Sequence, residues 1–169
     1  MTQPHHPYSP VVPLAPVHKV GAFTCGDNDI DQFLHERAAA EQALGLSQVY
    51  VSATGENDVI AYFTLSPITV RVEPALLAHI GAESVQYPAI GGFLLGRLGV
   101  DLSIQRRGIG EALVMRAAQI ARQEADVVGG VFLAVDPKTE RLAKWYAAQD
   151  FVSLGAASKR MVLPLRWIP

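Results

Sequence analysis

Residues 91–124, GGFLLGRLGVDLSIQRRGIGEALVMRAAQIARQE, form the stretch around which the rest of the chain is organised. The apolar run at residues 93–98 predicts a strand, and the helical periodicity after Gly110 predicts a helix. Between these elements, residues 101–110 contain neighbouring arginines and two glycines, which predict a loop. The order is therefore strand, loop and helix.

The loop at residues 105–110 has the chemistry of a phosphate site. The first N–H groups of a helix lack an acceptor inside the helix, and the helix dipole places partial positive charge there. Gly108 and Gly110 let a ligand approach the main chain closely, while Arg106 and Arg107 add mobile positive charge. The alternative is an ordinary strand-to-helix turn that uses glycine only for its geometry.

Two common phosphate loops do not match this pattern. A Walker A loop needs Lys and then Ser or Thr after its last glycine, but Glu111 and Ala112 follow Gly110. The dinucleotide fingerprint needs a third glycine, and Leu113 stands at that position. What remains is Gln-x-x-Gly-x-Gly, beginning at Gln105, between a strand and a helix.

Further motifs accompany this loop along residues 23–164. They are Phe23-Thr24-Cys25-Gly26, Ile30-Asp31-Gln32-Phe33-Leu34, Tyr62-Phe63-Thr64-Leu65-Ser66, Leu95-Gly96-Arg97-Leu98-Gly99-Val100-Asp101, and Lys144-Trp145-Tyr146 with Phe151. The loop resembles the pyrophosphate loop of the GNAT superfamily of acyl-CoA-dependent N-acetyltransferases. The wider set resembles the GNAT toxins of bacterial toxin–antitoxin pairs, which acetylate the amino group of aminoacyl-tRNA.

The resemblance implies an α/β chain with the GNAT fold, in which helices flank a mixed central sheet of α+β type. In that fold two central strands, here residues 91–100 and 131–135, splay apart and admit acyl-CoA. The implied cosubstrate is acetyl-CoA, with no metal. The implied cofactor-binding residues are Leu98, Gly99, Val100, Gln105, Arg106, Arg107, Gly108, Ile109 and Gly110. Backbone N–H groups at residues 98–100 would face the thioester carbonyl, where oxyanion stabilisation is a large catalytic effect.

Tyr146 is the expected catalytic acid. Transfer of an acetyl group from a thioester to an amine needs a neutral amine, a polarised carbonyl and a proton for the departing thiolate. The resemblance gives the proton to a tyrosine on the helix after the second central strand, which Tyr146 matches. A phenol with a pKa of about 10 keeps its proton at neutral pH. The alternative is a core aromatic, as expected for Trp145.

The general base is not identified. A free α-amino group has a pKa of about 8, so water or a backbone carbonyl could accept its proton. Similar proteins have Gly-Phe where this chain has Asp150-Phe151. Because Asp tolerates a left-handed turn better than most residues, the helix is still expected to end there.

The 169-residue chain is expected to contain one GNAT domain, residues 17–169, after a leader at residues 1–16. Pro4, Pro7, Pro10, Pro13 and Pro16 recur with the period of polyproline II, which predicts a mobile or surface-hugging leader. His5-His6 is too short to predict a metal site. The single cysteine, Cys25, excludes an intrachain disulfide and is expected to be a small, half-buried residue.

Composition favours a compact cytoplasmic protein. Apolar residues make up 50% of the chain and charged residues 18%. No apolar run approaches the roughly 20 residues of a membrane span, and the basic and apolar regions of a signal peptide are missing from the start. The expected location is therefore the cytoplasm, without membrane contact.

Positive charge gathers in the second part of the chain. Residues 1–96 carry a net charge of −6 and residues 97–169 carry +4. Contacts to nucleic-acid phosphates need only a local basic face, although this charge could instead serve CoA alone. The candidate tRNA-binding residues are Arg97, Lys138, Arg141, Lys144, Lys159 and Arg160.

The expected function is acetylation of the α-amino group of aminoacyl-tRNA by a toxin that blocks translation. One alternative is acetylation of a small amine or a protein N-terminus. Another is a CoA-binding module without turnover, which acts mainly through a DNA-binding antitoxin. The resemblance also implies a ribbon-helix-helix antitoxin as partner and a homodimer.

The remaining elements follow from hydrophobic periodicity and turn residues. Strands are expected at residues 17–23, 48–53, 59–68, 151–154 and 159–164, and helices at residues 27–44, 75–80 and 108–124. A last helix is expected to begin either at Asp136-Pro137 or at Thr139.

Overall fold

A computed structural model of the chain describes residues 8–155 and 158–169, and His5-His6, Pro4 and Pro7 lie outside the described residues. Strands form one mixed sheet in the order β1-β2-β3-β4-β5-β7-β6, with helices packed on it. This arrangement confirms the predicted fold class. The chain divides into two compact units, Met1–Thr64 with Arg97–Val114 and Leu65–Gly96 with Met115–Pro169.

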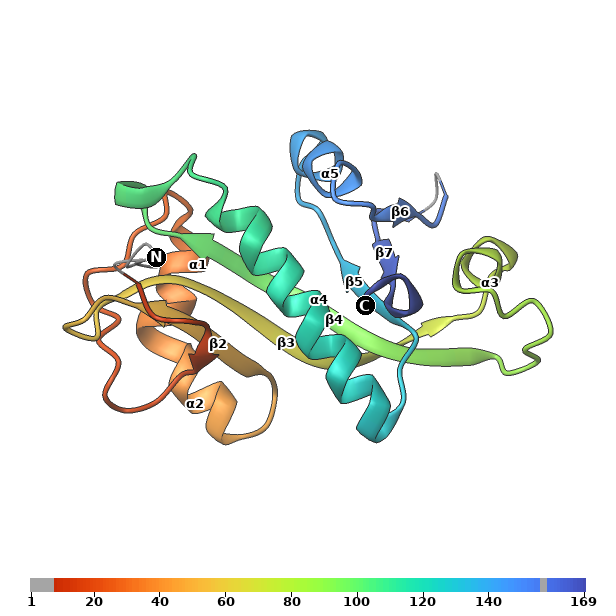
Figure 1. Cartoon of the computed structure of the whole chain (residues 1–169), viewed down its shortest axis with the longest axis horizontal. Coiled ribbons are helices and arrows are strands. Elements are labelled where there is room, and N and C mark those ends of the chain that lie inside the picture. Colours follow the sequence, from red (N-terminus) through yellow and green to blue (C-terminus); the bar gives the residue numbers. More distant parts are fainter. Residues whose placement is uncertain (1–7, 156–157) are drawn as a thin grey trace, which may run out of the picture. The chain divides into compact units, whose positions relative to one another are not determined.

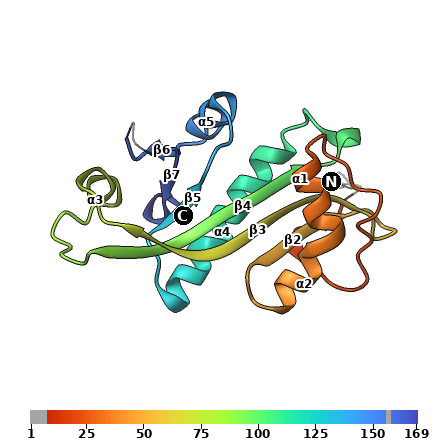
Figure 2. The ribbon, with the colours of Figure 1, turned by 180° about the vertical axis from the view of Figure 1, so that it is seen from behind.

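The first unit contains the predicted helix at residues 27–44, and the structure divides it into α1 (Asn28–Gln32), a π-helical segment η1 (Phe33–Arg37) and α2 (Ala38–Ala43). The Asp27 carboxylate begins α1 because it accepts hydrogen bonds from the N–H groups of Asp29 and Ile30. Helices α1 and α2 lie beside strand β2, Gln48–Ala53 (Figure 2).

The core of the first unit is built around Tyr62 on strand β3, Val59–Arg71. Its ring packs edge-to-face on Phe23, at a centroid distance of 5.5 Å, and stacks with Phe33 at 6.3 Å. Its hydroxyl donates to the carbonyl of Ile30 at 2.6 Å, so the buried phenol is satisfied. Helix α1 is thereby joined to the sheet by apolar and polar contacts.

The prediction of a strand at residues 17–23 is wrong. In this segment only Lys19 forms a β-bridge, with Asp58. Turns lie on both sides of it, because the N–H of His18 donates to Ala15 and the N–H of Phe23 donates to Val20. The edge of β2 is taken instead by β1, Val12–Pro13, in the described part of the proline-rich leader. The N–H of Leu14 and the N–H of Ser9 extend this pairing to Val49 and Ala53. The described part of the leader therefore lies along the sheet.

The second unit holds the C-terminal strands (Figure 1). Strand β5 (Phe132–Val135) pairs parallel with β4 (Ala89–Val100) and antiparallel with β7 (Met161–Pro164), and β6 (Val152–Ser153) pairs with β7. The helices are α3 (Pro74–Ile80), α5 (Glu140–Ala147) and α4 (Ile109–Val128), which begins in the first unit. The 3₁₀ turn η3 (Leu165–Trp167) also lies in the second unit, whereas the 3₁₀ turn η2 (Leu102–Ile104) lies in the first.

Strand β4 contacts β5 over a short register, with Phe93 opposite Leu133 and Leu94 opposite Ala134. At this point a glycine is required, since a Cβ on Gly92 would overlap the buried ring of Phe132. Strand β4 then continues beyond this register to Val100. In the described parts of the chain, no helix is long and apolar enough to cross a membrane.

Gly92→Ala is expected to lower the free energy of unfolding by about 1–3 kcal/mol, because the added methyl group overpacks the Phe132 ring. Gly91→Ala is the matched control, since its Cβ would meet nothing closer than 3.9 Å. Urea unfolding of both variants checks this. Equal midpoints for the two variants would contradict the close packing of β4 on β5.

Candidate active site

The end of strand β4 is fixed by the carboxylate of Asp101. One carboxylate oxygen accepts from the N–H and hydroxyl of Ser103, at 3.0 and 2.7 Å, and begins the turn η2. The other accepts from the N–H of Thr24 at 3.0 Å. Burial alone would raise the pKa of Asp101, but the hydrogen bonds from Ser103 and Thr24 lower it below its usual range. The carboxylate is therefore charged at neutral pH.

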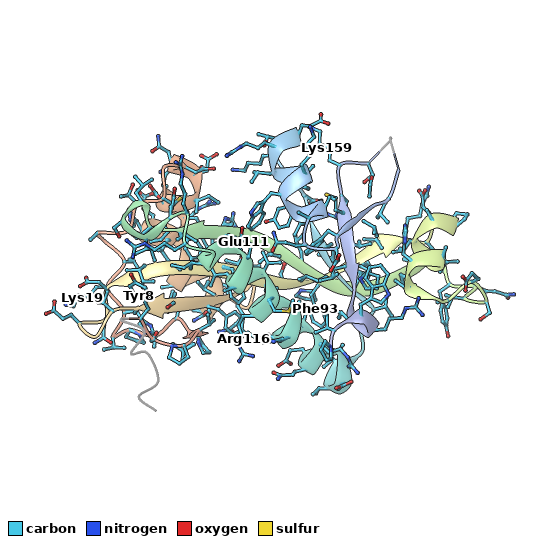
Figure 3. The ribbon with its side chains drawn as sticks, turned by 45° about the horizontal axis from the view of Figure 1, so that its top comes forward. Tyr8, Lys19, Phe93, Glu111, Arg116 and Lys159 are labelled. Atoms are coloured by element: carbon cyan, nitrogen blue, oxygen red, sulfur yellow. The ribbon has the colours of Figure 1, made fainter. Side chains whose placement is uncertain are left out.

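Helix α4 begins at Ile109, close to where the sequence predicts. The carbonyl of Gly108 accepts from the N–H of Ala112 at 3.1 Å, so the N–H groups of Ile109 and Gly110 precede the intrahelical hydrogen bonds. Gly108 has a φ of 76°, which favours glycine, and a Cβ there would meet nothing within 4 Å. Glu111 lies in the first turn of this helix (Figure 3).

The side chains of the loop divide into two kinds. Arg106 and Arg107 are exposed, and Arg106 has a φ of 63°, which is strained for a residue with a side chain. Gln105 is turned inward, and its amide nitrogen donates to the carbonyls of Cys25 and Val100 at 2.8 Å each. The structure thus brings Gln105 against the end of β4, whereas the arginines remain open to solvent.

The last residues of β4 are held against α1. A Cβ on Gly99 would lie 2.7 Å from the Cγ2 atom of Ile30 and 3.1 Å from the ring of Phe23. Gly99 is buried, whereas Leu98 and Val100 are half-buried. This backbone segment is therefore fixed by close packing, as a backbone donor to a thioester would have to be.

The side chain of Arg97, a candidate for tRNA binding, packs inside the protein fold. Its guanidinium lies 3.8 Å from the centroid of the Phe33 ring, and its N–H donates to the hydroxyl of Thr64 at 3.0 Å. The residue is half-buried. A cation over an aromatic face is a stabilising contact, so this charge already has a structural partner.

Tyr146 lies on α5 in the second unit. Of the two expected helix starts, Thr139 is the N-cap, because its hydroxyl accepts from the N–H of Leu142 at 3.2 Å. The Tyr146 side chain is buried and packs edge-to-face on Trp145 and Phe151, at centroid distances of 4.9 and 5.3 Å. Burial raises the pKa of Tyr146 to about 12. Helix α5 ends at Ala147, and Asp150 in the following turn has a φ of 71°, as expected.

The basic residues of the second unit differ in their exposure. Lys138, Arg141, Lys144 and Lys159 are exposed, and Lys159 lies just before β7 (Figure 3). Arg160 instead binds the Asp136 carboxylate through two hydrogen bonds of 2.8 Å. These hydrogen bonds lower the pKa of Asp136. Arg160 therefore joins the end of β5 to the start of β7, a role that charge counting could not reveal.

Two further side chains complete the surroundings of the loop. Asp31, which had no assigned role, is buried and accepts from the Thr24 hydroxyl at 3.0 Å and from the Cys25 N–H at 2.8 Å. Burial raises the pKa of the Cys25 thiol to about 12, which makes it a poor nucleophile and fits the expected structural role. Among the described residues, no cluster of His, Cys, Asp and Glu side chains could hold a metal ion.

The comparisons with known proteins agree on one family. A model of the acetyltransferase (GNAT) family matches residues 24–151. A tRNA-acetylating toxin of Mycobacterium tuberculosis (strain ATCC 25618 / H37Rv) is 27% identical over 149 residues, which cover 85% of this chain and 84% of the relative.

Solved structures share the fold. AtaT complexed with acetyl-methionyl-tRNAfMet has a TM-score of 0.87 at 23% identity, covering 95% of this chain and 96% of that chain. A tyrosine-to-phenylalanine variant of KacT has a TM-score of 0.87 at 21% identity, covering 96% and 98%. AtaTR bound with acetyl-CoA has a TM-score of 0.82 at 23% identity, covering 95% of each chain.

Tyr146 is expected to stay protonated in the folded protein at pH 10, because burial raises its pKa to about 12. Ultraviolet titration of the wild type and Tyr146→Phe between pH 8 and 10 should then show equal tyrosinate absorbance. An ordinary phenol, with a pKa of about 10, would be half ionised at pH 10. A difference of half a tyrosinate between proteins that circular dichroism finds folded would contradict the buried environment.

Proposed function

Since the chain belongs to the acetyltransferase (GNAT) family, whose model spans residues 24–151, we propose that it acetylates the α-amino group of aminoacyl-tRNA and blocks translation as a toxin. The observation that carries the reaction class is the start of α4, where Ile109 and Gly110 offer N–H groups beside two exposed arginines. The proposed acceptor follows from the tRNA-acetylating relative and from the exposed basic residues of α5.

The proposed cosubstrate is acetyl-CoA, which supplies the activated acetyl group when bound. Ile109 and Gly110 would hold its pyrophosphate through backbone N–H groups, and Arg106 and Arg107 would neutralise the phosphates. The backbone of residues 98–100 would bind the thioester end. The closely packed Gly99 supports this assignment, because a fixed donor stabilises developing negative charge at little reorganisation cost.

Tyr146 would protonate the departing thiolate. Its buried phenol carries the proton across the neutral range, since burial raises its pKa. The attacking α-amino group must be neutral, and an appreciable fraction is neutral near pH 8. The rate should therefore rise with pH as the amine loses its proton, without an opposing loss of the tyrosine proton in this range.

The proposed tRNA surface includes Arg141 and Lys144 on α5, together with Lys138 before it and Lys159 before β7. All four side chains are exposed. An antitoxin partner is proposed because AtaT is known in complex with the C-terminus of its antitoxin AtaR. We also propose that this partner has a ribbon-helix-helix fold and that the toxin forms a homodimer.

Gly110→Glu is expected to abolish most acetyl-CoA binding, because it adds bulk and negative charge at the helix start. Gly55→Glu introduces the same side chain in a turn where a Cβ would meet nothing within 4 Å, and it serves as control. Calorimetry measures the affinities, and circular dichroism checks folding. Undiminished affinity in folded Gly110→Glu would place the cofactor elsewhere.

Tyr146→Phe is expected to lower kcat by about 10²-fold and leave acetyl-CoA affinity unchanged, because only the proton donor is removed. Tyr87→Phe removes an exposed hydroxyl and should have no effect. Steady-state rates at saturating acceptor check both variants. A wild-type rate in Tyr146→Phe would make this tyrosine a packing residue.

Radiolabelled acetyl-CoA should label charged tRNA, whereas the deacylated pool should remain unlabelled. Arg141→Glu with Lys144→Glu should raise KM for tRNA by about tenfold or more and leave KM for acetyl-CoA unchanged, since phosphate contacts provide much of the affinity. Arg71→Glu, an exposed arginine from the acidic part of the chain, is the charge-reversal control.

Salt should weaken wild-type binding to tRNA steeply, because binding to phosphates releases counterions. Label on neither tRNA pool, with activity on a polyamine or a peptide N-terminus, would move the protein to the small-amine or N-terminal class.

A further inference from the structure

The phosphate loop is joined to the segment before α1 by a set of hydrogen bonds. The N–H of Thr24 donates to Asp101 at 3.0 Å, and the N–H of Leu102 donates back to the Thr24 carbonyl at 2.9 Å. Gln105 adds its hydrogen bond to the Cys25 carbonyl at 2.8 Å. We call the group formed by Thr24, Cys25, Asp31, Asp101 and Gln105 the loop anchor.

Gln105 uses its side-chain donors inside the loop anchor. A primary amide has two N–H donors, and its nitrogen lies 2.8 Å from each of two carbonyls, those of Cys25 and Val100. A hydrogen bond from this nitrogen to a phosphate would have to replace one of them. The residue therefore has the geometry of a brace between strand end and loop, and not that of a ligand.

Asp31 fixes the far side of the loop anchor. Its carboxylate holds the Thr24 hydroxyl and the Cys25 N–H, and it lies in α1, whose first turn is capped by Asp27. Burial alone would raise the pKa of Asp31, but the hydrogen bonds from Cys25 and Thr24 lower it, so this acceptor stays charged. The carbonyl that Gln105 binds thus belongs to a segment with little freedom.

The residue that follows Gln105 explains why a brace is needed. Arg106 has a φ of 63°, a conformation that a non-glycine residue keeps only when its surroundings hold it. Gln105 holds the chain immediately before this residue, and α4 begins three residues later at Ile109. Without the brace, the loop would be free to relax, and the N–H groups of Ile109 and Gly110 would lose their common direction.

We propose that Gln105 is a positioning residue that, with Asp31 and Thr24, sets the phosphate loop in its binding geometry before any cofactor arrives. This proposal rests on the proposed acetyl-CoA site. Preorganisation of this kind strengthens binding because the ordering cost is met in the free protein. Its effect is greatest on the pyrophosphate half of the cosubstrate, because Arg106 and the start of α4 follow Gln105 directly.

The test compares Gln105→Met, which keeps side-chain length but removes the donors, with the control Gln119→Met at an exposed position of α4. The loss of two neutral hydrogen bonds should lower kcat/KM for acetyl-CoA by about tenfold. The value for S-acetylpantetheine, which lacks the pyrophosphate, should fall much less, although Gln105 also binds the carbonyl of Val100. In the cofactor-free protein, amide hydrogen exchange across residues 105–112 should accelerate only in Gln105→Met.

Thr24→Val provides a second variant, since it removes only the hydroxyl that donates to Asp31. It should change acetyl-CoA affinity in the same direction by about threefold. Unchanged exchange in cofactor-free Gln105→Met, with weaker acetyl-CoA binding, would make Gln105 a direct ligand and overturn the proposal. Equal loss with S-acetylpantetheine would also overturn it.

Failure of the proposed function is distinguishable from failure of this proposal. If the wild type does not bind acetyl-CoA, the proposed function fails, while the exchange measurement still tests the loop anchor. If the wild type binds and Gln105→Met binds equally well with unchanged exchange, the loop anchor alone is refuted.

Discussion

Strand β4 must stop at Val100 for the chain to present the start of a helix, and the carboxylate of Asp101 enforces this stop. It accepts hydrogen bonds from Ser103 in the following turn and from Thr24. These hydrogen bonds hold the chain in a turn where the strand would otherwise continue. The turn η2 then redirects the chain toward α4. Everything proposed for the loop depends on this change of direction, because it leaves the first N–H groups of a long helix at the end of a strand.

The burial of Tyr146 has opposing effects on its proposed chemistry. Desolvation raises the pKa of the phenol, which keeps the proton in place but makes the group a weaker acid. A thiolate that leaves beside a buried phenol experiences the same desolvation, and its own pKa rises as well. The proton transfer is therefore less unfavourable than the shifted phenol alone would indicate. Packing on Trp145 and Phe151 fixes the ring for this transfer.

Elements with strong local signals could be predicted from the sequence. The continuous apolar run of β5 and the left-handed residue Asp150 each depend on neighbouring residues, and the structure has them as expected. Thr139 was one of the two expected starts of α5. The strand expected at residues 17–23 is not formed, because turn hydrogen bonds close at His18 and Phe23 and only Lys19 is bridged, to Asp58. Local propensity does not show that residues 12–13 pair with β2. Nor does periodicity show that a π-helical segment divides the first helix.

The sequence could predict the backbone N–H groups of the candidate site, but not the partners of its side chains. Glycines and arginines before a helix indicate an anion site wherever the chain folds this way. The partners of individual charges are set by tertiary contacts, as Arg97 over Phe33 and Arg160 on Asp136 illustrate. The same limit applies to Gln105, which the motif places in the loop, although its hydrogen bond to Cys25 joins residues far apart in sequence.

We propose that the loop between β4 and α4 holds the pyrophosphate of acetyl-CoA. A crystal structure of the chain with acetyl-CoA tests it most directly. We expect pyrophosphate oxygens within about 2.7–3.2 Å of the N–H nitrogens of Ile109 and Gly110, with the Gln105 amide still hydrogen-bonded to the carbonyls of Cys25 and Val100. A pyrophosphate bound away from these N–H groups would contradict it.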